Sequence, residues 1–377
     1  MNFSFTEEQE MYRSSIARLV RDHYDIETRR KIVASDLGMS RQNWTEFAEL
    51  GLLALPFPEK FGGLGGSLLD TLVVMEEFGR GIVVEPYFES VVLTGEFLIL
   101  AGSESQKSRI IPKVVSGETI LATAFAERQS RYDPADVETS AYEDGSGFII
   151  NGKKSVVWGG PWADTFVVTA RTSGGQRDTA GISLFLVEAS VEGVSRRNYR
   201  TIDGGRACEL GLDDVRVSDD ALIGVLDEGL TIVEEVFDRA RVGLCAEALG
   251  AMKVLNETTV EYAKVRKQFH KPIGKFQAIQ HRLVEMLVVL EEAVSATYMA
   301  ALRIDSKPEQ RQKAVSAAKA KVGEAARFIG KNAVPIHGGI GMSDELNVGH
   351  YFKRLTMIDI SLGDQSYHIG RYAGLSQ

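Results

Sequence analysis

The chain has 377 residues and a formal net charge of −9, with 44% hydrophobic and 25% charged residues. This composition is typical of a folded globular protein of two or three domains and excludes a disordered or collagen-like chain. The acidic balance argues against a general nucleic-acid-binding protein, which needs a basic surface. An anionic small molecule would need only a local basic pocket.

The cysteines, the apolar runs and the N-terminus indicate where the protein works. Cys208 and Cys245 fit neither a zinc spacing nor a disulfide framework, which favours a reducing compartment. No apolar run approaches the roughly 20 residues that span a bilayer, and the first ten residues lack the features of a signal peptide. The six histidines lie far apart without a metal-binding spacing. We therefore expect a cytoplasmic protein with no membrane segment and no metal site.

Residues 1–118 have a mainly helical pattern. Thr6 and Gln9 form a capping-box signal at the start of a helix. Apolar residues then recur at helical spacing, at Met11, Ile16, Leu19 and Val20. The glycine-rich segment 59–66 lacks the preceding strand and the Lys-Ser/Thr ending of a phosphate-binding loop. We expect it to reverse the chain between helices.

Residues 119–224 read as strands. Short β-branched and aromatic runs occupy residues 119–125, 147–150, 165–169 and 182–187. Asn151-Gly152 follows one of these runs and predicts a hairpin turn, because both residues tolerate positive φ. The close spacing of the runs, without helices between them, predicts an antiparallel barrel or sandwich.

Helical patterns return from residue 225 onward. An apolar stripe at helical spacing comprises Leu283, Met286, Leu287, Leu290 and Val294. Residues 314–326 are rich in good helix formers. Such helices pack as a bundle and can bury a face against another subunit. The predicted fold class is α+β: an N-terminal helical domain (1–118), a middle antiparallel β domain (119–224) and a C-terminal helical bundle (225–377).

Three stretches carry a family resemblance. They are residues 265–280 (VRKQFHKPIGKFQAIQ), residues 335–342 (PIHGGIGM) and residues 148–154 (FIINGKK), the last expected to open a β hairpin. They resemble the flavin-dependent acyl-CoA dehydrogenases, whose helix–β–helix order matches essentially the whole chain. The chain is particularly similar to small-subunit types such as those of pimeloyl-CoA dehydrogenase. The resemblance implies FAD, an acyl-CoA substrate and, as electron acceptor, an electron-transfer flavoprotein.

The resemblance assigns one half of an FAD site to the C-terminal third. It implies that Arg266, with its motif partners Phe269 and Gln277, reaches the FAD pyrophosphate of a neighbouring subunit. A guanidinium fork suits a diphosphate better than an ammonium does. Gly338 and Gly339 match the glycines that let the backbone approach the adenosine end, although Pro335 replaces the family's Gln.

The other half of the flavin site departs from the family pattern. The family's flavin-cradling turn, Thr-Glu-Pro-Gly-Ala-Gly-Ser-Asp, corresponds to residues 126–133, where only Glu127 and Asp133 match. Trp158 stands where the family has a threonine whose hydroxyl bonds the flavin. Its indole either stacks on the flavin ring or fills the place that the ring has vacated.

The catalytic base is missing from both positions that the family uses. Leu362 stands where most members carry a glutamate, and Ala240 stands at the alternative position on the first long C-terminal helix. Neither side chain can accept a proton. Asp364, with Asp359 nearby, is the remaining candidate for a displaced base. The favoured interpretation of Asp364 is a helix-terminal or hydrogen-bonding aspartate.

Three residues on that helix match family positions near bound CoA: Phe237, Asp238 and Arg241. Asp238 and Arg241 have i, i+3 spacing, so both can face one ligand or form an intrahelical ion pair.

Three hypotheses follow. In the first, the chain is a subunit of an acyl-CoA dehydrogenase heterotetramer and completes a related partner's FAD site with Arg266, Gly338 and Gly339. In the second, it is a self-sufficient homo-oligomeric dehydrogenase with a displaced base. In the third, it is an acyl-CoA-binding structural subunit without redox activity.

Overall fold

The computed structural model describes residues 6–376, which divide into two compact units, each discontinuous in sequence. The helical unit comprises the described residues up to Ser35, residues Leu69–Val83 and the described residues from Arg241 onward. The β unit comprises Asp36–Leu68 and Val84–Ala240. Helix α7 (Gly229–Val265) begins in the β unit and continues into the helical unit.

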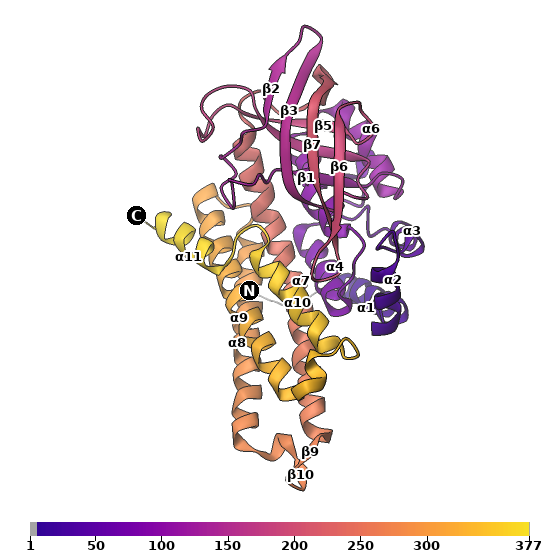
Figure 1. The fold of residues 1–377 in the computed structure, drawn as a ribbon, viewed down its shortest axis with the longest axis vertical. Coiled ribbons are helices and arrows are strands. Elements are labelled where there is room, and N and C mark those ends of the chain that lie inside the picture. Colours follow the sequence, from indigo (N-terminus) through magenta and orange to yellow (C-terminus); the bar gives the residue numbers. More distant parts are fainter. Residues whose placement is uncertain (1–5, 377) are drawn as a thin grey trace. The chain divides into compact units, whose positions relative to one another are not determined.

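Besides α7 and the short helical turns η4 (Ile273–Lys275) and η5 (Gly338–Met342), the described part of the helical unit contains seven α-helices. They are α1 (Glu7–His23), α2 (Ile26–Ala34), α4 (Leu68–Gly81), α8 (Gln277–Leu302), α9 (Pro308–His337), α10 (Asn347–Ile360) and α11 (Gln365–Gly374). The hairpin β9–β10 (Lys267–Gln268, Lys271–Pro272) and the turn η4 (Ile273–Lys275) separate α7 from α8, as Figure 1 shows. The predicted capping box is confirmed: Thr6 and Gln9 exchange side-chain and backbone hydrogen bonds at the start of α1.

Two glycines bring α4 and α7 into backbone contact. A Cβ atom on Gly79 would lie 1.9 Å from the carbonyl oxygen of Glu247, and one on Gly250 would lie 1.8 Å from that of Glu76. No larger residue fits either position without separating the helices. Beside this crossing, the Glu247 carboxylate accepts two hydrogen bonds from Arg354, at 2.6 and 2.7 Å. The glycines therefore set the spacing, and the ion pair satisfies the buried charge.

The predicted apolar stripe on α8 is only partly buried. Met286 and Leu290 are in the core, whereas Leu287 is 52% exposed. The outer side of α8 is therefore more apolar than the surface of a single chain requires.

The β unit contains a mixed sheet in the strand order β6-β7-β3-β2-β4-β5-β8, with β1 beside β4. The strands are β1 (Leu121–Ala124), β2 (Ser140–Glu143), β3 (Gly147–Trp158), β4 (Thr165–Arg171), β5 (Ile182–Glu188), β6 (Val194–Arg200), β7 (Arg206–Ser218) and β8 (Leu222–Ile223). The predicted antiparallel pairing holds along most of the sheet. In addition, β1 pairs parallel with β4, and β2 touches β4 in the same sense.

The predicted hairpin turn at Asn151-Gly152 is wrong, because both residues lie inside β3. The chain turns earlier, at residues 144–146, between β2 and β3. Asn151 instead exchanges two hydrogen bonds with Asp214, and a Cβ atom on Gly152 would lie 2.4 Å from Thr139 Oγ1. The glycine is needed for close approach and not for a turn.

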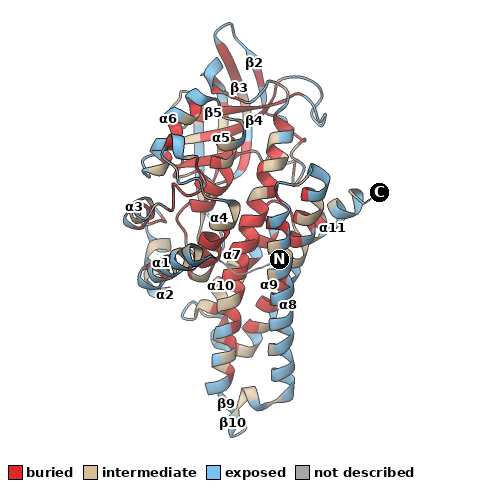
Figure 2. Ribbon diagram, turned by 180° about the vertical axis from the view of Figure 1, so that it is seen from behind, coloured by how far each residue is buried: buried red, intermediate tan, exposed pale blue. Residues whose placement is uncertain are grey.

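The central strands of this sheet are buried and its edge is not. Every residue of β5 except the last is buried, whereas β6 is exposed or half-buried along its whole length (Figure 2). Phe148, Phe166, Phe185 and Leu210 are among the residues of the core cluster. Sheets of this kind are stabilised mainly by such packing.

Helical segments of the β unit are α3 (Arg41–Glu49), η1 (Glu59–Phe61), η2 (Phe88–Thr94), α5 (Gly95–Ala101), α6 (Glu104–Val115) and η3 (Asp219–Ala221). The glycine-rich segment 59–66 reverses the chain as predicted. Gly65 and Gly66 donate backbone hydrogen bonds to Phe57 and Leu55, at 2.8 and 2.7 Å. None of the described helices is both long and apolar enough to cross a membrane.

Candidate functional site

The three residues of the Arg266 motif lie together at one end of the helical unit. Arg266 directly follows α7, and Phe269 and His270 form the turn between β9 and β10 with φ values of 52° and 63°. Two left-handed residues in succession are typical of a type I′ hairpin turn. Phe269 is 82% exposed, and Arg266 and Gln277, the first residue of α8, are also exposed. We call residues 265–277 the basic tip.

The glycine pair lies at this same end, where α9 stops. Gly338 follows the last residue of α9 with φ 68° and ψ −150°. The Tyr262 hydroxyl donates to the carbonyl of His337 at 3.2 Å, and the two rings lie 4.4 Å apart. Because Tyr262 is one helical turn before Arg266, this contact brings the arginine motif and the glycine pair to the same end. A Cβ atom on Gly338 or Gly339 would meet no atom within 4 Å, so both backbones face open space.

The donor set of the basic tip fits the diphosphate of FAD. Its cations are Arg266, Lys267, Lys271 and Lys275. They are exposed, and the tip contains no carboxylate. Exposed guanidinium and ammonium donors beside glycine backbone are what a diphosphate requires. Arg266, Gly338 and Gly339 would hold that group, and FAD would supply the hydride acceptor of the reaction.

The turn at residues 126–133 in the β unit is closed on itself. The Glu127 carboxylate accepts hydrogen bonds from Lys154 Nζ at 2.7 Å and from the backbone N–H groups of Glu138 and Thr139. Gln129 donates a further hydrogen bond to it at 2.8 Å. Burial opposes ionisation of Glu127, but the charge of Lys154 and these hydrogen bonds outweigh it and hold the pKa at about 2. The Glu127 carboxylate is therefore satisfied by groups of the β unit itself.

Trp158 ends a distorted stretch of β3. The register slips between Lys154 and Val157, and Val156 has φ 53°, which is rare for a β-branched residue. The Trp158 ring packs edge-on against Phe125 at 6.1 Å, and Phe125 packs in the same way against Phe237 at 4.6 Å. Trp158 is thus the end of a row of three aromatic rings.

Leu362 occupies a loop that is held from several sides. It is 4% exposed and has φ 54°, a strained value for leucine. Its carbonyl accepts hydrogen bonds from Arg241 Nε at 2.9 Å and from His368 Nε2 at 3.2 Å, so this His368 nitrogen carries a proton. Burial and the charges of Arg241 and Lys319 hold the pKa of His368 far below its ordinary value.

Lys319 holds the same loop from α9. Its ammonium donates to the carbonyls of Ile358, Asp359 and Gly363, at 2.8, 2.9 and 3.0 Å. The side chain is 1% exposed, and burial lowers its pKa to about 8. The connection between α10 and α11, which contains Leu362, is therefore held by hydrogen bonds from Lys319, Arg241 and His368.

The two aspartates beside Leu362 have structural partners. Asp364 is the N-cap of α11, and its Oδ1 accepts the Tyr367 N–H at 2.9 Å. Asp359 forms an ion pair with Arg327 at 3.3 Å and lies directly against Gly323. Ala240, at the other family position for a base, is fully buried.

The residues proposed near CoA are all buried. Phe237 is 3% exposed against Phe125, and Asp238 is fully buried. Arg241 is 3% exposed and donates to the Leu362 carbonyl. Sequence patterns did not point to Lys154 or Lys319, because a lysine in a strand or helix gives no sign that it is buried. Within residues 6–376, no group of His, Cys, Asp or Glu side chains could hold a metal ion.

Comparisons with known proteins agree with this architecture. Models of the N-terminal, middle and C-terminal domains of acyl-CoA dehydrogenases match residues 6–118, 122–215 and 227–373. The 3-(aryl)acrylate reductase of Clostridium sporogenes is 31% identical over 366 residues, which cover 95% of this chain and 96% of that protein.

Solved structures show the same fold. A chain of the ChsE4-ChsE5 complex from Mycobacterium tuberculosis superposes with a TM-score of 0.91 at 26% identity, covering 99% of this chain and 98% of that one. The FAD complex of PigA superposes with a TM-score of 0.92 at 26% identity and covers all of both chains. The chain therefore belongs to the acyl-CoA dehydrogenase family of FAD-dependent oxidoreductases.

Proposed function

We propose that this chain is a subunit of a heteromeric acyl-CoA dehydrogenase that has no base of its own and completes the flavin site of a related partner subunit. The observation that carries the proposal is Leu362, which aligns with the position of the family's base. The backbone around it is held by hydrogen bonds from Arg241 and Lys319. The reaction would be α,β-dehydrogenation of an acyl-CoA thioester. The three domains of the chain would be residues 1–118, 119–224 and 225–377. The matches to the three family models support this division.

The chemistry requires a group that this chain lacks at the expected place. Removal of the proton α to a thioester needs a positioned base, and efficiency falls steeply when that base is displaced. Leucine has no proton-accepting atom. The contacts of Lys319, Arg241 and His368 hold the loop so that Asp364 stays at the start of α11. A partner subunit would therefore supply the carboxylate.

The basic tip and the turn that follows Gly338 support the second half of the proposal. Val265 and Phe269 of the tip are 71% and 82% exposed, and Met342 of the turn is 78% exposed. Apolar side chains this exposed, next to cations, are typical of a surface that another chain covers. In the complex, Arg266 would pair with the diphosphate of FAD held by the partner.

The outer side of α8 also supports association. Val284, Leu287, Val288 and Met299 are exposed, and three of them line a shallow groove along the helix. We infer that a related acyl-CoA dehydrogenase chain covers this face in a heterotetramer. A structural neighbour is a chain of the ChsE4-ChsE5 complex, so a chain of this fold occurs in a complex of two named proteins.

Two features of the β unit support the proposal that this chain does not bind flavin in its own β unit. Glu127 is occupied by Lys154, and the threonine hydroxyl of the family is replaced by Trp158. Of the two roles considered for Trp158, its packing against Phe125 favours filling the place of the flavin ring. Phe237, Asp238 and Arg241 remain proposed CoA contacts.

Other parts of the assignment rest on the family and the composition. An electron-transfer flavoprotein is the proposed electron acceptor, and a dicarboxylyl, branched or ring-bearing acyl-CoA ester is the proposed substrate class. Both cysteines are free and buried, which suits the expected cytoplasmic location.

The test is to purify the chain alone and together with a related chain, encoded beside it, that has a glutamate at the position aligned with Leu362. We expect the pair to be yellow and to oxidise acyl-CoA, and the lone chain to be colourless and inactive. Because one relative is named a reductase, the assay should follow both directions of the reaction. Full flavin content and strong activity in the lone chain would contradict the proposal.

A matched pair of variants distinguishes the catalytic roles of the two subunits. Replacing the partner's glutamate by glutamine should abolish activity, whereas Leu362→Met in this chain should leave it unchanged. The self-sufficient alternative predicts that Asp364→Asn abolishes activity with flavin retained. A purified assembly without flavin colour would favour the non-redox alternative.

A further inference from the structure

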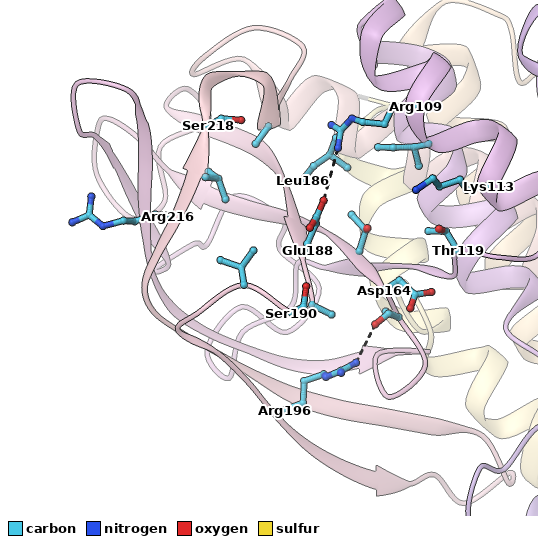
Figure 3. A pocket seen from close by; sticks show the side chains of 17 residues that line it. Arg109, Lys113, Thr119, Asp164, Leu186, Glu188, Ser190, Arg196, Arg216 and Ser218 are labelled. Atoms are coloured by element: carbon cyan, nitrogen blue, oxygen red, sulfur yellow. Dashed lines mark hydrogen bonds and ion pairs between the residues drawn. The ribbon is translucent and has the colours of Figure 1, made fainter.

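A hollow of about 610 Å³ opens in the β unit, and nothing in the proposed dehydrogenase function uses it. It lies between α6 and the ends of β5, β6 and β7 (Figure 3). Its apolar lining includes Ala163, which belongs to the core cluster, and Ala189, Val191 and Val217, which pack against that cluster. The hollow therefore opens onto the end of the β core, a place where barrel-like folds commonly bind ligands.

Four basic side chains surround the opening: Arg109, Lys113, Arg196 and Arg216. Two of them have carboxylate partners close by. Arg109 pairs with Asp220 at 3.2 Å and more loosely with Glu188 at 3.9 Å, and Arg216 pairs with Asp144. These two arginines are therefore largely neutralised.

Arg196 differs from them. Its Nη1 donates to the carbonyls of Gly160 and Ala163, at 3.1 and 3.0 Å, and its guanidinium lies 6.0 Å from the Phe166 ring. No carboxylate among the described residues lies within ion-pair distance of it. The two carbonyls fix the guanidinium while its other nitrogens keep their donors.

Lys113 is the second cation of the hollow whose carboxylate partner is distant. Its partner Glu118 is 3.9 Å away, and both side chains are more than half exposed. Such a pair contributes little and is easily exchanged for another anion. Asp164, an acidic residue of the lining, accepts the Ile120 N–H at 2.8 Å. Its charge is thus partly satisfied by the backbone.

We propose that this hollow binds an organic anion with a compact apolar body, of the class that includes medium-chain carboxylates. The carboxylate would pair with Arg196, with Lys113 as the second cation, because a guanidinium offers two parallel donors to a carboxylate. The hydrocarbon would lie on Ala189, Val191 and Val217. The volume is in the range of small-ligand pockets, which is roughly 300–1,000 Å³.

The test is calorimetric titration of the full-length chain with octanoate, beside inorganic phosphate and 1-octanol. We expect saturable binding of one octanoate per chain and much weaker binding of the other two. Phosphate lacks the apolar body and octanol lacks the charge. Phosphate or octanol binding as tightly as octanoate would overturn the proposal, as would no binding of octanoate.

Two variants locate the site. Arg196→Gln keeps a donor for the carbonyls of Gly160 and Ala163 and removes the charge, so octanoate affinity should fall about tenfold or more. Ser190→Trp, at an exposed position of the lining, should fill the hollow and abolish binding without a change of charge. The control is Arg197→Gln, because successive residues of β6 face opposite sides and Arg197 does not line the hollow.

Thermal unfolding of each variant shows whether it is folded. Octanoate binding that survives in both Arg196→Gln and Ser190→Trp would place the ligand elsewhere and overturn the proposal. The measurement needs neither flavin nor partner, so its outcome is independent of the proposed dehydrogenase function.

Discussion

The basic tip and the turn at residues 126–133 are the two regions where the family resemblance places FAD, and they are built in opposite ways. The tip exposes Arg266 and Phe269 and leaves the glycine backbones at 338 and 339 in open space. The turn buries Glu127 and gives its carboxylate four hydrogen-bond donors from within the β unit. One region leaves its polar groups exposed, and the other satisfies its carboxylate with donors from within the β unit.

A residue that matches the family can therefore serve either the fold or the binding of a ligand. Glu127 matches the family, yet its contacts explain it as part of the fold. Arg266 matches the family, and nothing in its position suggests a role in folding. Four predictions test this distinction.

The largest effect is expected from Lys154→Met. The substitution leaves the buried Glu127 carboxylate without its cation, and removing one partner of a buried ion pair costs about 3–5 kcal/mol. The free energy of unfolding of the lone chain, measured in urea, should fall by this amount. The double variant Glu127→Gln/Lys154→Met should recover part of it. A loss below about 1 kcal/mol would mean that the turn is not held by this pair.

The second prediction concerns acid stability. The pKa of Glu127 is about 2 in the folded chain against an ordinary 4.5, so between these values the unfolded chain binds more protons. The contribution of Glu127 to stability is therefore complete above the ordinary value and is lost as pH falls toward 2. It amounts to about 3 kcal/mol.

Urea unfolding at neutral and acidic pH checks this prediction. The stability difference between the natural chain and Glu127→Gln should shrink as the pH is lowered through that window. A difference that does not depend on pH would argue against an ionised Glu127.

The third prediction is that Arg266→Ala weakens flavin retention in the assembled pair at least about tenfold, because charge-assisted hydrogen bonds to the diphosphate are lost. The stability of the lone chain should change by less than about 0.5 kcal/mol, since Arg266 is exposed. Flavin absorbance after gel filtration measures retention. The control is Lys264→Ala, whose side chain pairs locally with Glu261 at 2.6 Å. Equal flavin loss in both variants would remove the special role of Arg266.

The smallest effect is expected from Asp364→Asn. Asparagine caps a helix about as well as aspartate, so stability should change by only a few tenths of a kcal/mol. Activity of the assembled pair should stay within about twofold, because Asp364 caps α11 and the proposal assigns the base to the partner. Loss of activity with flavin and fold retained would show that Asp364 is the base after all.

Local patterns in the sequence were sufficient wherever neighbours along the chain decide the structure. The capping box at Thr6 and Gln9 and the reversal at 59–66 depend on residues within one or two turns, and both formed as predicted. The hairpin prediction at Asn151-Gly152 failed because residues distant in the sequence decide the structure there. A distant residue, Asp214, bonds Asn151, and the crowding of Gly152 by Thr139 outweighs the local turn propensity.

Burial of polar groups was not predictable. Lys154 and Lys319 are among the most buried residues of the chain, and each acts through oxygens that lie far away in sequence. The hollow at Arg196 is likewise lined by α6 and by strands β5, β6 and β7, which lie far from α6 in the sequence. Such sites depend on which surfaces meet, and that depends on strand order and helix packing.

The helix–β–helix order, the family and the leucine at position 362 could be read from the amino-acid sequence, because they depend on residue type and spacing alone. The tertiary structure decided what each retained polar residue does. Glu127 is neutralised by a lysine from a neighbouring strand, Asp364 caps a helix, and Arg266 reaches the surface. The ionisation of a side chain and its effect on stability depend on burial and on the distance to its partners. Both are properties of the folded chain.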